Sequence, residues 1–109
     1  MKTEIKEYNM RQIKLMGKKI KDYLNKKIYI DWLINDLEGL VNCIKNPPKG
    51  FVNNFLHFWS RLEVCYANML FEKRNYFTSQ EKDLIQEALI NIQELIEKYK
   101  TEYLSDLEE

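Results

Sequence analysis

The stretch FVNNFLHFWSRLEVCYANMLFE, residues 51–72, decides the fold. Its apolar side chains recur every three or four residues, which is the spacing of one face of an α-helix. These side chains are Phe51, Phe55, Phe58, Trp59, Leu62, Tyr66, Met69 and Leu70. Because this apolar arc is the widest in the chain, we expect residues 51–72 to form the central core helix.

Three further segments show helical periodicity, over residues 4–25, 30–45 and 78–103. Pro47 ends the second segment, because the residue before a proline is disfavoured in the α region. Thr78-Ser79-Gln80-Glu81 fits a capping box, in which hydroxyl and carboxylate bond reciprocally to backbone amides. The expected apolar stripes include Leu24 in the first segment and Leu84 in the last.

The length and the composition agree with one helical domain. A chain of 109 residues suits a single domain, residues 1–109, and the three glycines and two prolines are too few for the turns of a β-sandwich. Helices of this length joined by short connections pack best as antiparallel neighbours. The sequence therefore predicts an all-α protein, an antiparallel four-helix bundle.

The sequence contains no targeting segment and no membrane span that we can recognise. No apolar run approaches 18 residues, and the N-terminus leads into charged residues instead of a signal peptide. Cys43 and Cys65 match no zinc spacing and are too few for a disulfide scaffold. We therefore expect a cytoplasmic protein whose mature chain begins at Met1.

Charge is distributed unevenly along a chain whose formal charge is zero. Residues 1–28 hold nine basic and three acidic side chains, a net charge of +6, whereas residues 76–109 hold three basic and nine acidic side chains, a net charge of −6. The two ends could screen one another as neighbouring helices, or one of them could face a charged partner.

Helical geometry places four acids of the last segment opposite its apolar arc, with one apolar residue among them. These residues are Asp83, Glu87, Glu94, Glu97 and Ile90. Such an apolar anchor ringed by charge suits a binding surface, although a single exposed Ile is also common.

A second candidate surface lies on residues 30–45, where Trp32 and Asp36 are one turn apart with Asp31 and Asn35 beside them. Trp32 either covers a gap against a neighbouring helix or anchors an interface, and Trp is the residue type most enriched at binding hot spots.

Glu63 falls within the apolar arc of residues 51–72. An unpaired carboxylate there would cost several kcal/mol, so Glu63 must be paired, protonated or at the edge of the arc. We expect a structural ion pair or hydrogen bond to the first or second helix.

Catalytic motifs are missing from the sequence. His57 is the only histidine and has no neighbouring nucleophile, Glu-x-x-His pairs do not occur, and the three glycines are too far apart to cradle a phosphate. We therefore expect no enzymatic activity, no metal and no cofactor.

Residues 58–67, FWSRLEVCYA, resemble the W-x-x-L-E-x-x-Y-A pattern of small helical bacterial immunity proteins of contact-dependent growth inhibition and related polymorphic toxin systems. Residues 23–28 and 33–40 are similar to the first loop and second helix of that group. The resemblance implies a cytoplasmic inhibitor that binds the C-terminal domain of a toxin, often a nuclease, and blocks its active site. We assign Trp59, Leu62, Tyr66 and Ala67 of the motif to packing, and Glu63 to a structural polar contact.

We expect a basic nuclease to bind the two candidate surfaces. Their partner-binding residues are Asp31, Trp32, Asn35, Asp36, Asp83, Glu87, Ile90, Glu94 and Glu97. One alternative is a nucleic-acid-binding module that uses Arg11, Lys14, Lys18 and Lys21, although no base-reading side chains are interleaved with these cations. Another is a helical adaptor or oligomerisation domain that associates through Trp32 or Ile90.

Overall fold

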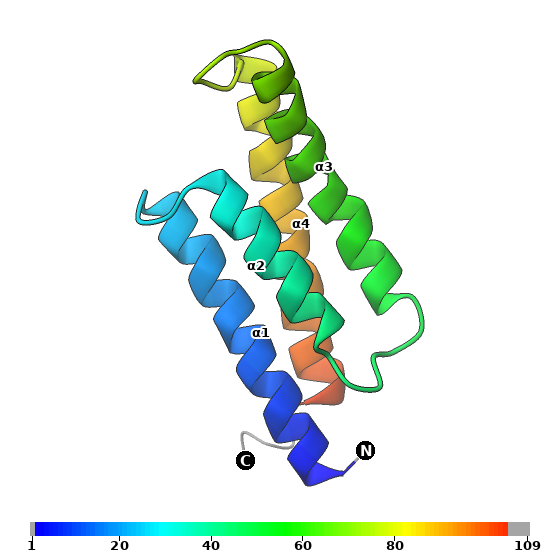
Figure 1. Ribbon diagram of the computed structural model, residues 1–109. Coiled ribbons are helices and arrows are strands. Elements are labelled where there is room, and N and C mark those ends of the chain that lie inside the picture. Colours follow the sequence, from blue (N-terminus) through cyan, green and yellow to red (C-terminus); the bar gives the residue numbers. More distant parts are fainter. Residues whose placement is uncertain (1, 105–109) are drawn as a thin grey trace.

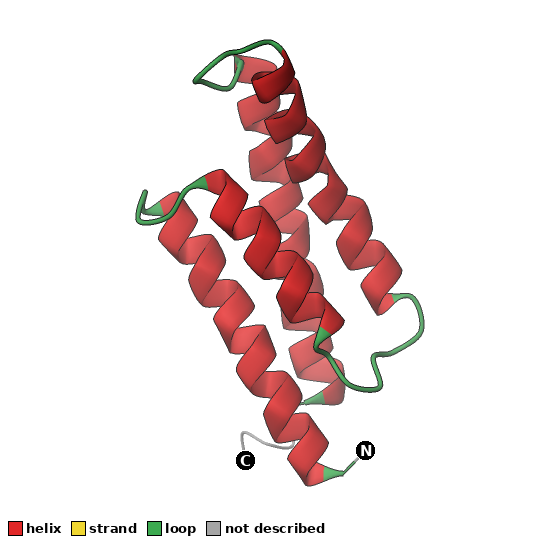
Figure 2. Ribbon diagram, viewed as in Figure 1, coloured by secondary structure: helices red, strands yellow, loops and turns green. Residues whose placement is uncertain are grey.

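The computed structural model describes residues 2–104 and contains four helices: α1 (Thr3–Leu24), α2 (Ile30–Asn42), α3 (Phe51–Phe71) and α4 (Ser79–Tyr103). Residues 2–104 include no strand (Figure 2), so the prediction of an all-α fold is confirmed. The prediction that the second helix reaches residue 45 is wrong. The amides of Cys43 and Ile44 donate to carbonyls only three residues back, which tightens the last turn and ends α2 before the prolines.

Each helix packs against the helices that precede and follow it, and α1 also packs against α4. The helices therefore form a closed ring in which α1 lies diagonally from α3, and α2 from α4. Figure 1 shows the chain rising along α1, returning along α2, rising along α3 and returning along α4. Gly50 begins α3 in the left-handed region with φ of 86°, where a side chain would be strained.

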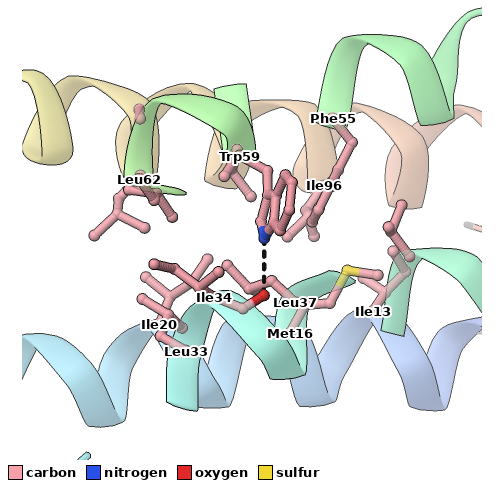
Figure 3. Packing of buried hydrophobic residues seen from close by; sticks show 14 of the residues in the cluster. Ile13, Met16, Ile20, Leu33, Ile34, Leu37, Phe55, Trp59, Leu62 and Ile96 are labelled. Carbon is pink, nitrogen blue, oxygen red and sulfur yellow. Dashed lines mark hydrogen bonds between the residues drawn. The ribbon is translucent and has the colours of Figure 1, made fainter. Parts of the chain in front are cut away.

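The core lies inside this ring and receives side chains from all four helices. Figure 3 shows a layer of α1 and α2 residues facing a layer from α3 and α4. The fully enclosed members include Met16, Ile20, Leu33, Leu37, Phe55, Leu62, Leu89 and Ile92. Burial of such aliphatic and aromatic surface is the main force that holds the helices together.

Three of the predicted core leucines are in fact exposed: Leu24, Leu70 and Leu84. Leu24 and Leu70 belong to the last turns of α1 and α3, near the ends of the bundle. In α4 the buried stripe passes through Ile85 and Leu89, so Leu84 points away from the core.

Two polar side chains form hydrogen bonds between helices inside the core. The Trp59 indole Nε1 donates to the carbonyl oxygen of Ile34 at 2.8 Å and joins α3 to the middle of α2 (Figure 3). Asn9, which is fully buried in α1, donates to the Lys45 carbonyl oxygen at 2.8 Å and to the Tyr99 hydroxyl at 3.1 Å, and it accepts from the Lys45 amide at 2.9 Å. One amide therefore connects three separate segments of the chain.

The predicted capping box begins α4. The Thr78 hydroxyl accepts from the Glu81 amide at 3.2 Å, and the Glu81 carboxylate accepts from the Thr78 amide at 2.9 Å. The Arg74 guanidinium also donates two hydrogen bonds to Glu81, at 2.7 and 3.1 Å. These hydrogen bonds lower the pKa of the Glu81 carboxyl to about 2, and those from Arg74 contribute more than the one from the Thr78 amide.

α1 and α3 end in the same way. In each helix the two residues after the C-cap donate backwards in the pattern of a Schellman motif, from Lys26 and Lys27 in one helix and from Lys73 and Arg74 in the other. The position that usually carries glycine is occupied by Lys26 with φ of 61° and by Lys73 with φ of 56°. A left-handed non-glycine residue costs roughly 1–2 kcal/mol.

Within residues 2–104, no helix is both long enough and apolar enough to cross a membrane.

Replacing Asn9 by Ala should lower the free energy of unfolding by about 2 kcal/mol, because the Lys45 amide and the Tyr99 hydroxyl would lose their partner. Urea denaturation followed by circular dichroism measures the change. Asn68→Ala, at an exposed position of α3, is the control and should alter stability little. Equal losses in the two variants would show that the Asn9 bonds do not stabilise the fold.

Acid should destabilise the protein through Glu81. Its pKa is about 2 in the folded state against 4.5 for an unperturbed carboxyl, so the stabilisation is present above pH 4.5 and is lost as the pH falls toward 2. Between pH 7 and pH 2, the melting temperature of Glu81→Gln should fall less steeply with decreasing pH than that of the wild type. Glu94→Gln, an exposed control, should retain the wild-type decline; an unchanged slope in Glu81→Gln would refute this role.

Candidate functional site

The outer surface of α4 carries the predicted carboxylates, and we call Asp83, Glu87, Ile90, Glu94 and Glu97 together the acidic face. The helix turns its buried stripe, which runs from Ile85 to Tyr99, toward the core, so residues on the opposite side reach solvent. All four acidic side chains are exposed, and Ile90 is 46% exposed among them. The structure therefore brings these five predicted residues onto one surface.

Little of the charge on the acidic face is neutralised by the rest of the described chain. Among residues 2–104 its single ion pair joins Glu87 to Arg61 of α3, with a nitrogen–oxygen distance of 3.8 Å between partly exposed groups. An exposed pair of this kind contributes little energy and is screened by salt. Lys98 borders the face near its C-terminal end, one turn after Glu94. The face as a whole stays negative.

The lysine-rich helix α1 does not screen the acidic face through direct pairs. Lys18 pairs with Asp22 in its own helix at 3.0 Å, and Lys19 pairs with Asp36 of α2 at 3.3 Å. The other cations that suggested nucleic-acid binding, Arg11, Lys14 and Lys21, are exposed to solvent. The chain thus carries opposite charges on separate surfaces.

The second predicted surface lies on α2 and consists of Asp31, Trp32, Asn35 and Asp36, which we call the α2 patch. Trp32 is 58% exposed, so the alternative in which it is buried over a gap against a neighbouring helix is wrong. The ring of Tyr29 meets Trp32 edge to face at 6.5 Å, and it is exposed as well. Trp32 points outward because the buried stripe of α2 follows Leu33, Leu37 and Val41.

The structure separates the acidic face from the α2 patch. α2 and α4 lie diagonally across the ring and do not contact each other within the described residues. Their outward surfaces therefore point in different directions, and one small partner domain could not use Trp32 as the anchor of the acidic face. Helical periodicity does not predict this separation, because it depends on the order of the helices around the core.

Two assignments within the W-x-x-L-E-x-x-Y-A motif are wrong. Trp59 and Leu62 are buried and Tyr66 is half-buried against the core, as expected, but Ala67 is exposed and does not pack there. Glu63 lies at the exposed edge of α3 and makes no ion pair or hydrogen bond to α1 or α2 in the described chain. The apolar arc of α3 is narrower than expected, since Leu70 is also exposed.

The polar groups that suggest chemistry are used in the fold or are isolated. Ser60 Oγ donates to the carbonyl oxygen of His57 at 2.8 Å, within its own helix. Burial raises the pKa of the Cys65 thiol, and Cys43 is exposed directly after the last residue of α2. No group of three or more His, Cys, Asp or Glu side chains in residues 2–104 could hold a metal ion.

Because Trp32 is exposed, Trp32→Ala should change the free energy of unfolding by less than about 0.5 kcal/mol. Trp59→Ala is the matched comparison and should cost about 3–5 kcal/mol, because it leaves a cavity and removes the bond to Ile34. Chemical denaturation of the two variants tests both statements. A loss of several kcal/mol on removing Trp32 would place it in the core.

Comparisons with known proteins identify no relative: no family model matches the sequence, and neither curated proteins nor solved structures give a significant match.

Proposed function

We propose that this chain is an antiparallel four-helix bundle that acts as a binding inhibitor, an immunity protein that covers the active site of a basic bacterial toxin domain with the acidic face of α4. A nuclease is the class of toxin that this surface suits best, since nucleases are basic where they hold phosphates. The proposal assigns no catalytic residue, metal or cofactor to the chain.

Contacts between helix ends support the antiparallel arrangement. Asn9, near the start of α1, bonds to Lys45 just after α2 and to Tyr99 near the end of α4. At the start of α3, the centroid of the Phe51 ring lies 4.7 Å from the centroid of the Tyr99 ring. The beginning of one helix thus meets the end of its neighbour, as in an up-and-down bundle.

The observation that carries the functional proposal is the exposure of four carboxylates that have almost no countercharge in the described chain. Like charges on one helix repel each other, and nothing in the packing of α4 requires them. Such a cluster attracts a basic protein over a distance of about 10 Å at moderate ionic strength, which raises the rate of association. The same carboxylates can occupy positions that nucleic-acid phosphates would otherwise take.

Ile90 supports a specific contact in addition to this long-range attraction. It is half-exposed at the centre of the acidic face, with Glu87 and Glu94 one turn away on either side. Apolar residues that become fully buried at the centre of an interface contribute much of the binding energy, and surrounding charged residues exclude water. Ile90 would therefore anchor the complex that the carboxylates attract.

The resemblance of residues 58–67 to immunity proteins leads to a genetic test of the partner. The gene for this chain should lie directly downstream of a large toxin gene, and the C-terminal toxin domain should co-purify with the chain when both are expressed together. Inhibition of that domain in vitro would follow from the proposal. Binding of nucleic acid by the isolated chain, with no effect on the toxin, would favour the alternative that uses the cations of α1.

Charge reversal tests the acidic face directly. The triple variant Asp83→Lys, Glu87→Lys and Glu94→Lys should keep its helicity but associate with the toxin domain at least about tenfold more slowly at low salt, because steering is reversed. The matched control makes the same charge change at exposed acids of the other helices, Glu7→Lys, Glu38→Lys and Glu63→Lys. Stopped-flow association rates that fall equally in both variants would show that the acidic face does not steer association.

A further inference from the structure

A groove of about 640 Å³ opens at the end of the molecule that carries the α1–α2 and α3–α4 connections. Figure 1 shows that the α3–α4 hairpin extends beyond the α1–α2 connection at this end. We call this opening the hairpin groove. Its apolar lining comes from both hairpins and includes Tyr23, Tyr29, Tyr66, Met69, Tyr76 and Phe77.

The apolar lining of the hairpin groove continues onto the outer surface. Tyr29 is 76% exposed, and its ring contacts that of Trp32, which is also exposed. Leu24, which also lines the groove, is more than half exposed. Large apolar side chains gathered in this way around a concavity are typical of an interaction site.

Uncompensated positive charge borders the hairpin groove. Lys26 lines it, and Lys27 and Lys73 are exposed on the two connections that form its walls. None of the three makes an ion pair within residues 2–104, whereas Glu72, beside Lys73, is already paired with Arg74. Asp31 is the one acidic residue among the described lining residues. The border therefore favours an acidic ligand.

Lys26 and Lys73 occupy corresponding positions on the two walls. Both follow a Schellman motif in the left-handed conformation, where glycine would be less strained. The fold therefore does not require lysine at either position. A charge held at a conformational cost in each of the two connections whose residues line the groove favours a role in binding.

We propose that the hairpin groove binds an amphipathic helix of a partner protein, one whose apolar anchors are flanked by acidic residues. Helices bind grooves of this kind by placing residues spaced at i, i+3, i+4 and i+7 into an apolar channel. The recess between the hairpins suits an inserted helix better than it suits a flat lipid surface, and the lysines select negative charge. This site is separate from the acidic face of α4 and does not rest on the proposed function.

The test uses two labelled helical peptides of about 16 residues, long enough to form a helix in water. Both carry Leu at i, i+3, i+4 and i+7, and they differ only in having Glu or Lys at the polar positions. The Glu peptide should bind the full chain, and the Lys peptide should bind at least about tenfold more weakly at low salt. Fluorescence anisotropy measures both affinities.

The double variant Lys26→Gly and Lys73→Gly separates binding from folding. It should melt at the same or a higher temperature, because glycine relieves the left-handed strain, and it should bind the Glu peptide about tenfold more weakly. The control Lys14→Ala and Lys21→Ala removes the same charge from exposed positions of α1 and should leave the affinity within about twofold of the wild type.

Several results would overturn the proposal. They are equal affinity for the two peptides, no binding of either peptide, and an unchanged affinity in the Lys26 and Lys73 variant. Concentration-dependent self-association that is lost with Tyr76→Ala would assign the groove to a second copy of the chain. Binding to vesicles of anionic lipid without binding to the Glu peptide would assign it to a membrane surface. None of these results bears on the acidic face.

Discussion

The buried side chain of Asn9 is the contact on which the arrangement of the helices depends. An amide removed from water is tolerated only when its donors and acceptor are bonded, and Asn9 finds its partners at Lys45 and Tyr99. The same tyrosine packs against Phe51 at the start of α3. The buried apolar stripe turns α4 toward the core, and this set of contacts adds polar and aromatic partners that set its position relative to α1 and α3. With Tyr99 turned inward, Asp83, Glu87, Glu94 and Glu97 must face solvent.

This orientation explains how a chain of zero formal charge presents two charged surfaces. The lysines of α1 that form ion pairs do so with Asp22 and Asp36, not with α4. The repulsion between the clustered carboxylates of α4 is therefore not offset by cations of the described fold. A basic partner would offset it. Exposed lysines lie on the two connections beside the hairpin groove, so the groove would select a different ligand. Two sites of opposite charge on one small bundle are compatible, because they do not share residues.

Periodicity and capping signals were sufficient to predict four helices, and Thr78 and Glu81 marked the start of α4 correctly. Periodicity places a residue on a face only to within the width of that face, which is why Leu84 was assigned to the core in place of Ile85 and why Glu63 was expected to be paired. The exposure of Trp32, the bonds of Asn9 and the hairpin groove depend on which helices become neighbours. A local sequence pattern does not determine the order of the helices around the core. These features could therefore be found only in the structure.

The acidic face of α4 is the proposed binding surface for a basic toxin domain. Amide chemical-shift mapping of the isotopically labelled chain, titrated with the C-terminal domain of the proposed partner toxin, would locate the surface that binds. The largest changes should centre on Asp83, Glu87, Ile90 and Glu94, with the core amides little affected. Changes confined to α1 or to the α2 patch, or no change at saturating concentrations of that domain, would contradict the proposal.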